Sequence, residues 1–251
     1  GGARRVTPAP LGWFGIFRLG LVQAALGAVV VLTTATLNRV MVVELALAAA
    51  VPGTLVALHH AVQIMRPKFG HGSDVGGRRT PWIIGGMAVL TAGGLLAALA
   101  TAWMAEARVP GLVLAVAAFV MIGLGGAAAG TSLLALTASR VAPERRPSAA
   151  AVIWLMMIAG FVVTAGVAGT LLDPFSTTRL VMVAAGVAAG AFLLAMVAVA
   201  GLEGPGGVAA AVSDAPPPAF REAMAQIWAE PEARRFTLFV FVAMLAYSLQ
   251  D

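Results

Sequence analysis

The sequence predicts an all-α membrane protein that crosses the bilayer several times. Of its 251 residues, 60% are hydrophobic and only 11% are charged, and the mean hydropathy is +0.94. Six stretches lack Asp, Glu, Lys and Arg and exceed the roughly 20 residues that a helix needs to cross the hydrocarbon core. No stretch shows the alternation over about ten residues that is typical of a barrel strand. A soluble chain of this size needs more polar surface, so we expect helices in lipid.

Short polar gaps separate the six predicted spans. The spans are Leu19–Asn38, Leu45–Met65, Thr80–Ala105, Val109–Ser139, Pro147–Leu172 and Leu180–Leu202. We divide the chain into an N-terminal segment (1–18), a six-helix unit (19–202), a connection (203–235) and the start of a seventh helix (236–251). Because the last stretch is too short to span, we expect the chain to be the N-terminal half of a longer protein.

Glycine and proline predict local features of these spans. Pro52-Gly53 predicts a kink in the second span, because proline removes a helix hydrogen bond. The pairs Gly126/Gly130 and Gly186/Gly190 have the spacing at which small residues let two membrane helices approach closely.

The basic residues predict the orientation. With gaps numbered alternately, one side receives only Arg39, Arg108 and Arg179. The other receives Arg4, Arg5, Arg18, Arg66, Lys68, Arg78, Arg79, Arg140, Arg145, Arg146, Arg221, Arg234 and Arg235. By the positive-inside rule, this second side and the N-terminus are cytoplasmic, in a bacterial inner membrane. The net charge of +5 is therefore explained without nucleic acid. The absence of cysteine excludes disulfides and Cys-based metal sites.

The connection 203–235 begins rich in glycine and proline and then changes character. Phe220, Met224, Ile227 and Trp228 recur at helical spacing with charged residues between them, which predicts a short amphipathic helix. Such a helix lies either on the cytoplasmic membrane surface or against other loops of the same protein, and the pattern favours neither.

The most specific motif lies between the second and third spans. Gly70, Asp74, Gly77, Arg78 and Arg79 follow the pattern Gly-x-x-x-Asp-x-x-Gly-Arg-Arg. We expect a tight turn in which glycines relieve the backbone and Asp74 accepts hydrogen bonds from a helix N-terminus or an arginine. The motif resembles the signature cytoplasmic loop of the major facilitator superfamily. That resemblance implies a twelve-helix fold of two six-helix halves, which this loop latches together in the outward-facing state.

A narrower resemblance involves segments throughout the chain. The end of the first span carries Asn38, Arg39 and Glu44, and the segments 13–18, 58–63, 72–83 and 247–251 add to the pattern. Together they resemble the PucC family, a branch of the major facilitator superfamily. The resemblance implies a factor of phototrophic bacteria that assembles light-harvesting complexes in the intracytoplasmic photosynthetic membrane. Implied partners are bacteriochlorophyll, carotenoid, antenna polypeptides, and a reaction-centre complex or pigment-synthesis enzymes.

Four polar side chains within the predicted spans are candidate pigment-binding residues: Gln23, His59, His60 and Gln63. A neutral imidazole can ligate the magnesium of a bacteriochlorophyll, and His59 is our candidate for this. The favoured alternative is a histidine that hydrogen-bonds a neighbouring helix. Each glutamine could bind a pigment keto group or another helix. For Arg39 and Glu44, the simplest interpretation is a local ion pair that closes the turn.

Three functions were compared on these residues. A pigment-handling assembly factor fits a large apolar substrate and sparse polar groups. A major-facilitator transporter of another hydrophobic small molecule is the alternative, although the first and the third to sixth spans carry no acidic residue. We do not expect an enzyme. A prenyltransferase needs clustered aspartates to hold magnesium diphosphate, and the aspartates lie apart at Asp74, Asp173, Asp214 and Asp251.

Overall fold

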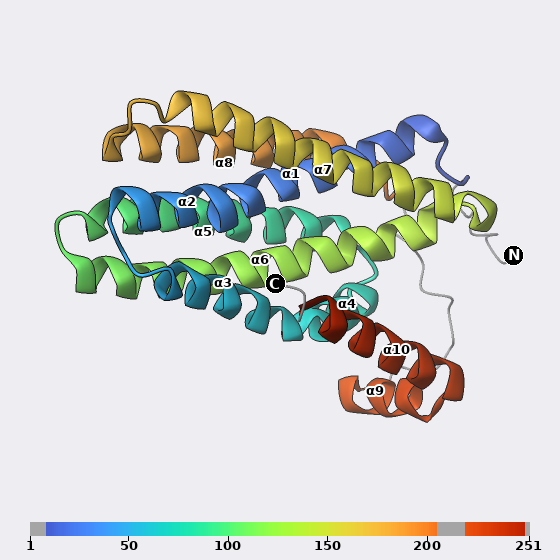
Figure 1. Ribbon diagram of the computed structural model, residues 1–251. Coiled ribbons are helices and arrows are strands. Elements are labelled where there is room, and N and C mark those ends of the chain that lie inside the picture. The colour runs from blue at the N-terminus through green and yellow to red at the C-terminus, as the bar shows by residue number, and fades with distance from the viewer. Residues whose placement is uncertain (1–8, 205–218, 249–251) are drawn as a thin grey trace, which may run out of the picture. The chain divides into compact units, whose positions relative to one another are not determined.

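The computed structural model describes residues 9–204 and 219–248, with side chains up to residue 243 (Figure 1). In these ranges every regular element is a helix, which confirms the predicted all-α class. The chain divides into two units, Gly1–Ala209 and Ala210–Asp251, and each is described by itself.

Five helices of the first unit are long and apolar enough to cross a membrane. The first runs from Trp13 to Glu44 and comprises α1 (Trp13–Val31), α2 (Leu37–Arg39) and two π-helical stretches, Leu32–Thr36 and Val40–Glu44. The others are α5 (Thr80–Met104), α6 (Arg108–Arg140), α7 (Arg146–Leu171, after a 3-10 turn at Pro143–Arg145) and α8 (Thr177–Val199). The protein is therefore a multi-pass membrane protein.

The second predicted span, Leu45–Met65, is not one unbroken helix. It contains α3 (Ala50–Val62), a 3-10 turn (Gln63–Met65) and then α4 (Arg66–Val75). Pro67 explains the break, because it has no N–H to continue the α-helical ladder. The predicted kink at Pro52-Gly53 is wrong. Pro52 lies in the first turn of α3, where a missing N–H costs little.

The first helix is longer than predicted at both ends. It begins at Trp13 instead of Leu19, and it continues past Asn38 to Glu44. Asn38, Arg39 and Glu44 therefore lie on its last turns, not in a loop after it. The two π-helical stretches widen the helix locally and carry it to Leu45, the residue that caps its end.

Close packing in the bundle depends on other glycines than predicted. A Cβ on Gly86 would lie 2.5 Å from the Ala129 nitrogen, and one on Gly160 2.5 Å from the Ala24 oxygen. These two glycines let α5 approach α6 and α7 approach α1. By contrast, a Cβ would meet nothing within 4 Å at Gly126, Gly186 and Gly190, and only a leucine methyl at 3.7 Å at Gly130. Among the described helices, the two spaced pairs therefore do not make the close approach that was predicted.

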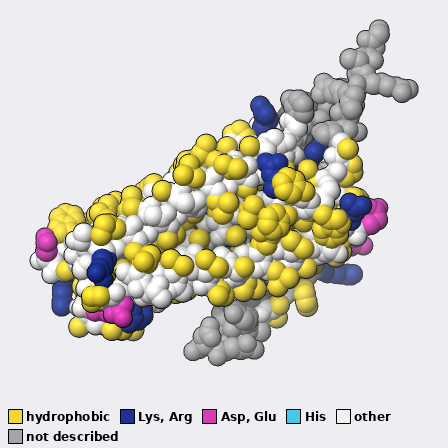
Figure 2. Space-filling model, turned by 90° about the horizontal axis from the view of Figure 1, so that it is seen from above, with side chains coloured by type: hydrophobic (Ala, Val, Ile, Leu, Met, Phe, Trp, Pro, Cys, Tyr) yellow, Lys and Arg dark blue, Asp and Glu magenta, His cyan; other side chains and the backbone are white. Residues whose placement is uncertain are grey.

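Charged side chains lie at the two ends of the bundle, with hydrophobic side chains between them (Figure 2). We call the end that carries Asp74, Arg78 and Arg79 the motif end, and the opposite end, where α2 finishes and α6 begins, the far end. Figure 1 shows α1, α5 and α7 starting at the motif end and α6 and α8 returning to it. In the described bundle, Arg39, Arg108 and Arg179 lie at the far end. The other basic residues lie at or toward the motif end, with Arg66 at the start of α4, before the motif loop. The cytoplasmic location of the motif end stays a prediction.

The second unit contains α9 (Phe220–Ala229) and α10 (Pro231–Ser248). Helix α9 covers the residues for which the sequence predicts an amphipathic helix. The backbone N–H of Ala219 donates to the Glu222 carboxylate over 3.3 Å, which caps its first turn. Within the unit, Met224, Ile227 and Trp228 are exposed. Helix α10 begins at Pro231, before the predicted Phe236. Residues 247–251, one of the segments behind the family resemblance, lie largely outside the described residues.

Candidate functional site

A cavity of about 390 Å³ opens between α1, α3, α6 and α7. It brings together the four polar side chains that the sequence singled out: Gln23 from α1, and His59, His60 and Gln63 from α3 and the turn after it. The rest of the wall is mostly apolar or small, and consists of Leu26, Val30, Gly126, Gly130, Leu134, Thr137, Ala138, Ala150, Ile153, Trp154, Met157 and Phe161, with Arg66 and Arg146. A mostly apolar pocket with a few polar groups is the usual form of a small-molecule site.

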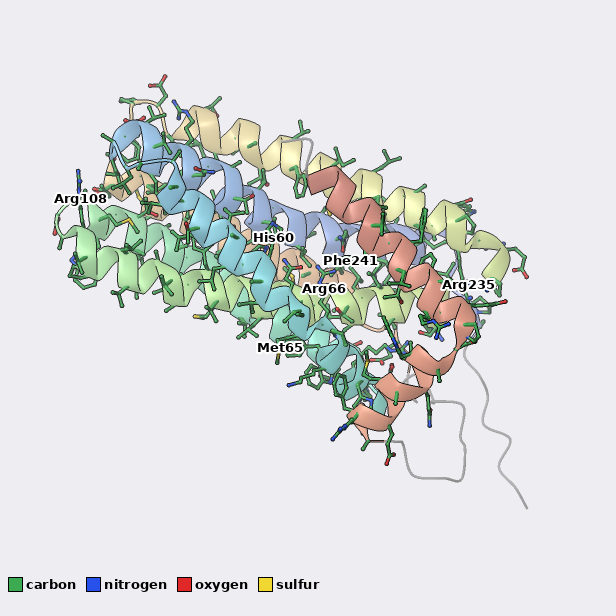
Figure 3. The ribbon with its side chains drawn as sticks, turned by 60° about the horizontal axis from the view of Figure 1, so that its bottom comes forward. His60, Met65, Arg66, Arg108, Arg235 and Phe241 are labelled. Carbon is green, nitrogen blue, oxygen red and sulfur yellow. The ribbon has the colours of Figure 1, made fainter. Side chains whose placement is uncertain are left out.

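A chain of hydrogen bonds fixes one wall of the cavity. The Nε2 atoms of Gln63 and His59 lie 2.8 Å apart, and the Arg66 guanidinium donates to the Gln63 side-chain oxygen. The three residues are four and three positions apart, so they lie on one face of the α3 segment. Because Gln63 engages Nε2 of His59, that ring is held by its own helix. His60 is exposed to the cavity, its ring 4.8 Å from that of His59 (Figure 3).

Two residues that line this cavity each have a buried polar atom with no hydrogen-bond partner among the described residues. The two atoms are Nδ1 of His59, a residue only 2% exposed, and the side-chain oxygen of Gln23. The Gln23 nitrogen contacts the Met157 sulfur at 3.2 Å, a weak acceptor. An unpartnered buried polar atom costs about 1–3 kcal/mol, so its presence at a cavity is typical of a binding site.

Glycines shape the cavity in two ways. Gly126 and Gly130 leave open space on the face of α6 that lines it. Gly123 instead lets α3 approach α6, because a Cβ there would lie 2.7 Å from the backbone oxygen of His59. The glycine-rich stretch of α6 thus positions the histidine pair and also leaves room beside it.

The motif loop, residues 70–79, lies at the motif end and is the end of a helix followed by a turn. Asp74 accepts a hydrogen bond from Arg79 over 2.7 Å, and the two form the one ion pair found among the described residues. Arg79 also donates to the Ala135 backbone oxygen at 2.6 Å and to Ser139 Oγ at 2.7 Å. Arg79 therefore ties the loop to α6.

The expected tight turn occupies only the end of the motif, after residue 75. Residues 66–75 are the helix α4, and only Gly77 has a positive φ, at 66°. Gly70 and Gly72 serve close packing: a Cβ would lie 3.3 Å from Thr131 at Gly70 and 3.0 Å from the Trp82 ring at Gly72. The prediction that all the motif glycines relieve the backbone is therefore wrong except at Gly77.

Glu203, at the end of the bundle segment after α8, caps the start of α5. Its carboxylate accepts hydrogen bonds from the backbone N–H groups of Arg79 and, over 2.9 Å, of Thr80. It is only 2% exposed. Burial alone would raise the pKa of Glu203, but these backbone hydrogen bonds and the nearby charge of Arg78 outweigh it and lower the pKa below its usual value. A carboxylate here also suits the positive end of the helix dipole.

A family model described as PUCC protein matches residues 36–251, most of the chain. The chain belongs to the PUCC family. It is 53% identical over 241 residues to the "Bacteriochlorophyll synthase 44.5 kDa chain" of Rhodobacter capsulatus, covering 96% of this chain and 56% of that protein. It is 29% identical to "Protein PucC" of Rhodovulum sulfidophilum, covering 94% and 55%.

A solved structure shares the fold. The peptide transporter POT (E310Q mutant), in complex with alafosfalin, aligns with a TM-score of 0.61 at 18% identity, over 96% of this chain and 49% of the transporter. The chain thus spans about half the length of the relatives and the transporter that it matches. At this identity, the likeness shows a transporter-type helical fold and nothing of the substrate.

The structure does not bring every predicted residue of this PUCC-family chain to one site. Asn38, Arg39 and Glu44 lie toward the far end and do not line the cavity. Arg39 and Glu44 form no ion pair, since Asp74–Arg79 is the single one in the described ranges, so that expectation is wrong.

Three residues that matter here were not singled out from the sequence. Glu203, Arg66 and Arg146 each read as an ordinary charge at the end of an apolar run. For Arg66 a signal existed, because it is seven residues after His59 and so shares its helical face. Glu203 had no such signal, since Arg79 lies 124 residues away in sequence.

Proposed function

We propose that this protein is a membrane-embedded assembly factor for bacterial light-harvesting complexes, which binds bacteriochlorophyll and delivers it to antenna polypeptides. The chain would form the first six-helix half of a twelve-helix major-facilitator-type fold. The Gly70–Arg79 end would face the cytoplasm of a photosynthetic inner membrane. We assign it no catalytic step.

The main observation that supports this proposal is the lining of the cavity. The cavity is bounded by apolar side chains of α1, α6 and α7, and its few polar groups are two histidines, two glutamines, two arginines and one threonine. Histidine is a good axial ligand for a pigment magnesium, and glutamine can donate to a ring carbonyl. Membership of the PUCC family and the printed name of the Rhodobacter capsulatus relative both favour a tetrapyrrole as the ligand.

Within the cavity, His60 is better placed than His59 to ligate magnesium. His59 is buried and its Nε2 atom is engaged by Gln63, whereas His60 lines the cavity with no such bond. We therefore transfer the pigment-ligand role to His60, with His59 and Gln63 as the residues that position it. Gln23, whose oxygen has no partner, faces the same space from α1.

The test is purification of the protein, expressed from its complete gene in a pigment-producing phototroph, in a mild detergent. Absorption spectra and protein identification then measure bound pigment and antenna polypeptides. We expect bacteriochlorophyll in a fixed ratio to protein and at least a fivefold lower ratio for His60→Leu. His71→Leu, outside the cavity, is the control and should keep the ratio. Protein from such cells without any pigment or antenna subunit would contradict the proposal.

A second candidate is a transporter of another hydrophobic small molecule. The likeness to the peptide transporter favours it, because that fold serves transport there. Reconstitution into liposomes separates the two functions. Movement of a soluble or apolar solute by pigment-free protein would support the transporter, and pigment transfer from the protein to antenna polypeptides without solute movement would support the assembly factor.

A further inference from the structure

We propose that helix α9 (Phe220–Ala229) lies in the headgroup layer of the membrane, at the place where α10 enters the bilayer, with its apolar face toward the hydrocarbon. The partner of this face is the lipid bilayer. The inference goes beyond the proposed function and does not depend on it, because it concerns only the second unit of the chain.

The first observation is an apolar stripe on α9 that the described residues leave uncovered. At 100° per residue, Met224, Ile227 and Trp228 fall within an arc of about 100° on the helix surface. All three side chains are exposed, and Trp228 is 52% exposed. The polar side chains of Glu222 and Gln226 lie outside this arc. A helix with one apolar stripe is stable when the stripe contacts an apolar surface, so α9 requires such a surface.

The second observation is that α10 is apolar on every side beyond its first turn. Seven consecutive positions cover the whole circumference of a helix, and in 236–242 all but one are large, apolar and exposed: Phe236, Leu238, Phe239, Val240, Phe241 and Val242. The exception, Thr237, donates its hydroxyl to the Ala233 backbone oxygen over 2.8 Å and so needs no water. A helix of this kind belongs in lipid from Phe236 onward.

Basic residues mark the point at which α10 meets the membrane surface. Arg234 and Arg235 directly precede the apolar stretch, which is the usual place of arginine beside a membrane helix. Figure 3 shows Arg235 near the start of α10 and Phe241 farther along the same helix. The boundary between headgroups and hydrocarbon therefore lies close to Phe236.

The third observation is how little chain separates α9 from this boundary. Helix α9 ends at Ala229, Glu230 follows, and α10 begins at Pro231. From Pro231 to Phe236 the helix rises by about 8 Å. The headgroup layer on each side of a bilayer is roughly 5–8 Å thick. The end of α9 is therefore held at the level of the headgroups, where lipid is the nearest apolar surface.

The backbone between the two helices allows them to take different directions. Glu230 is extended, with φ −77° and ψ 118°, which is the conformation favoured before a proline. Pro231 has no N–H with which to continue the hydrogen bonds of α9. A continuous helix would lead the apolar stripe away from the membrane, whereas this break lets α9 lie along its surface. Trp228, the residue of the stripe nearest to α10, is of the type that is enriched at headgroup level.

Labels at single cysteines measure which face of α9 meets lipid. The chain contains no cysteine, so the protein is expressed from its complete gene, with any cysteine of the remainder replaced by serine, as Ile227→Cys or Gln226→Cys. A fluorophore on the cysteine is quenched in phosphatidylcholine nanodiscs, either by a nitroxide near the headgroup end of the lipid chains or by iodide in the water. We expect the nitroxide to quench the label at Ile227→Cys about threefold more than at Gln226→Cys, and iodide to show the reverse order.

Two further labels make the comparison decisive. Phe239→Cys is the control for insertion of α10, and a nitroxide deep in the lipid chains should quench its label. If Ile227→Cys does not fold, Trp228→Cys on the same stripe takes its place with the same expectation.

Three results would overturn the proposal. Strong quenching by iodide at both α9 positions, with none by the lipid nitroxide, would place α9 in water. A label at Ile227→Cys that neither reagent reaches would show that protein covers the stripe. An unquenched label at Phe239→Cys would remove α10 from the bilayer, and the argument for α9 with it. None of these results bears on pigment binding, so the proposed function is tested separately.

Discussion

Two polar regions of this bundle differ in how their charges are satisfied. At the motif end, Asp74, Arg79 and Glu203 each have a partner: Asp74 pairs with Arg79, and Glu203 accepts from the start of α5. In the cavity, His59 and Gln23 each have a buried atom without a partner, and two arginines lack a carboxylate.

This contrast indicates that the charges at the motif end stabilise the fold, whereas the polar groups of the cavity are placed to bind a ligand. In a network where every charged group has a partner, the hydrogen bonds offset the free energy of removing those groups from water. Polar groups without partners leave that free energy uncompensated until a ligand supplies the missing hydrogen bonds. We therefore expect substitutions at the motif end to change stability more than ligand binding, and substitutions in the cavity to do the reverse.

Replacement of Glu203 by alanine should have the largest effect on stability. It leaves the backbone N–H groups of Arg79 and Thr80 without their acceptor, and two hydrogen bonds to a charged group contribute about 3–6 kcal/mol together. Thermal unfolding in detergent, followed by circular dichroism, measures the loss. Glu203→Gln keeps an acceptor and should lose about half as much. Normal unfolding of Glu203→Ala with impaired pigment binding would reverse the proposed contrast.

The pH dependence of stability tests the same carboxylate. The pKa of Glu203 is lower in the folded protein than its usual value of 4.5, so its charged form stabilises the fold above that pH. This contribution is lost as the pH falls below about 4.5 towards the folded pKa. The unfolding temperature of the unaltered protein should therefore exceed that of Glu203→Gln by a constant amount above about pH 4.5 and approach it as the pH falls further, through the folded pKa. A difference that stays constant well below pH 4.5 would show that Glu203 is not the group that titrates.

The ends of the membrane helices could be predicted from the sequence, because they depend on whether a residue lies in lipid or in water. Lipid excludes charge, so the gaps between apolar runs locate the ends of α5, α6, α7 and α8 within a few residues. The same argument gave a wrong result between Leu45 and Arg66, where it predicted one continuous helix. The length of an uncharged stretch carries no information about the helix hydrogen bond that Pro67 removes. The second predicted span is therefore not confirmed, because the helix found there, α3 (Ala50–Val62), is not one of the five that are long enough to cross a membrane.

The site could be predicted only in part, because composition does not fix which face a residue occupies. Gln23, His59 and Gln63 were predicted because they are polar residues within the predicted spans, and the fold brings them to one cavity. The spacing of the glycines gave the wrong packing residue, since Gly125 packs against α5 while the adjacent Gly126 faces open space. One residue is a rotation of about 100° on a helix, and only the packed structure fixes that rotation.

Replacement of Gln23 by leucine should raise stability by about 1 kcal/mol, because it removes a buried oxygen that has no partner. The same substitution should lower pigment binding if Gln23 contacts the ligand. Gln63→Leu is the matched variant, and it should lower stability because His59 and Arg66 both lose a hydrogen bond. Unfolding temperatures of the two variants, measured side by side, should move in opposite directions. A loss of stability in both would mean that the Gln23 oxygen is satisfied in the membrane.

Replacement of Asp74 by asparagine should have the smallest effect on stability, below about 1 kcal/mol. The Asp74 side chain is 56% exposed, and exposed ion pairs contribute little. Arg79 also keeps its bonds to Ala135 and Ser139, so the loop stays attached to α6. When the unfolding temperatures of Asp74→Asn and Arg79→Ala are compared in the same detergent, Arg79→Ala should show the larger loss of stability. Pigment delivery to antenna polypeptides in cells that carry only Asp74→Asn is the second measurement. If delivery fails while stability is kept, the Asp74 carboxylate acts on a partner other than Arg79, which is what a latch between two halves requires.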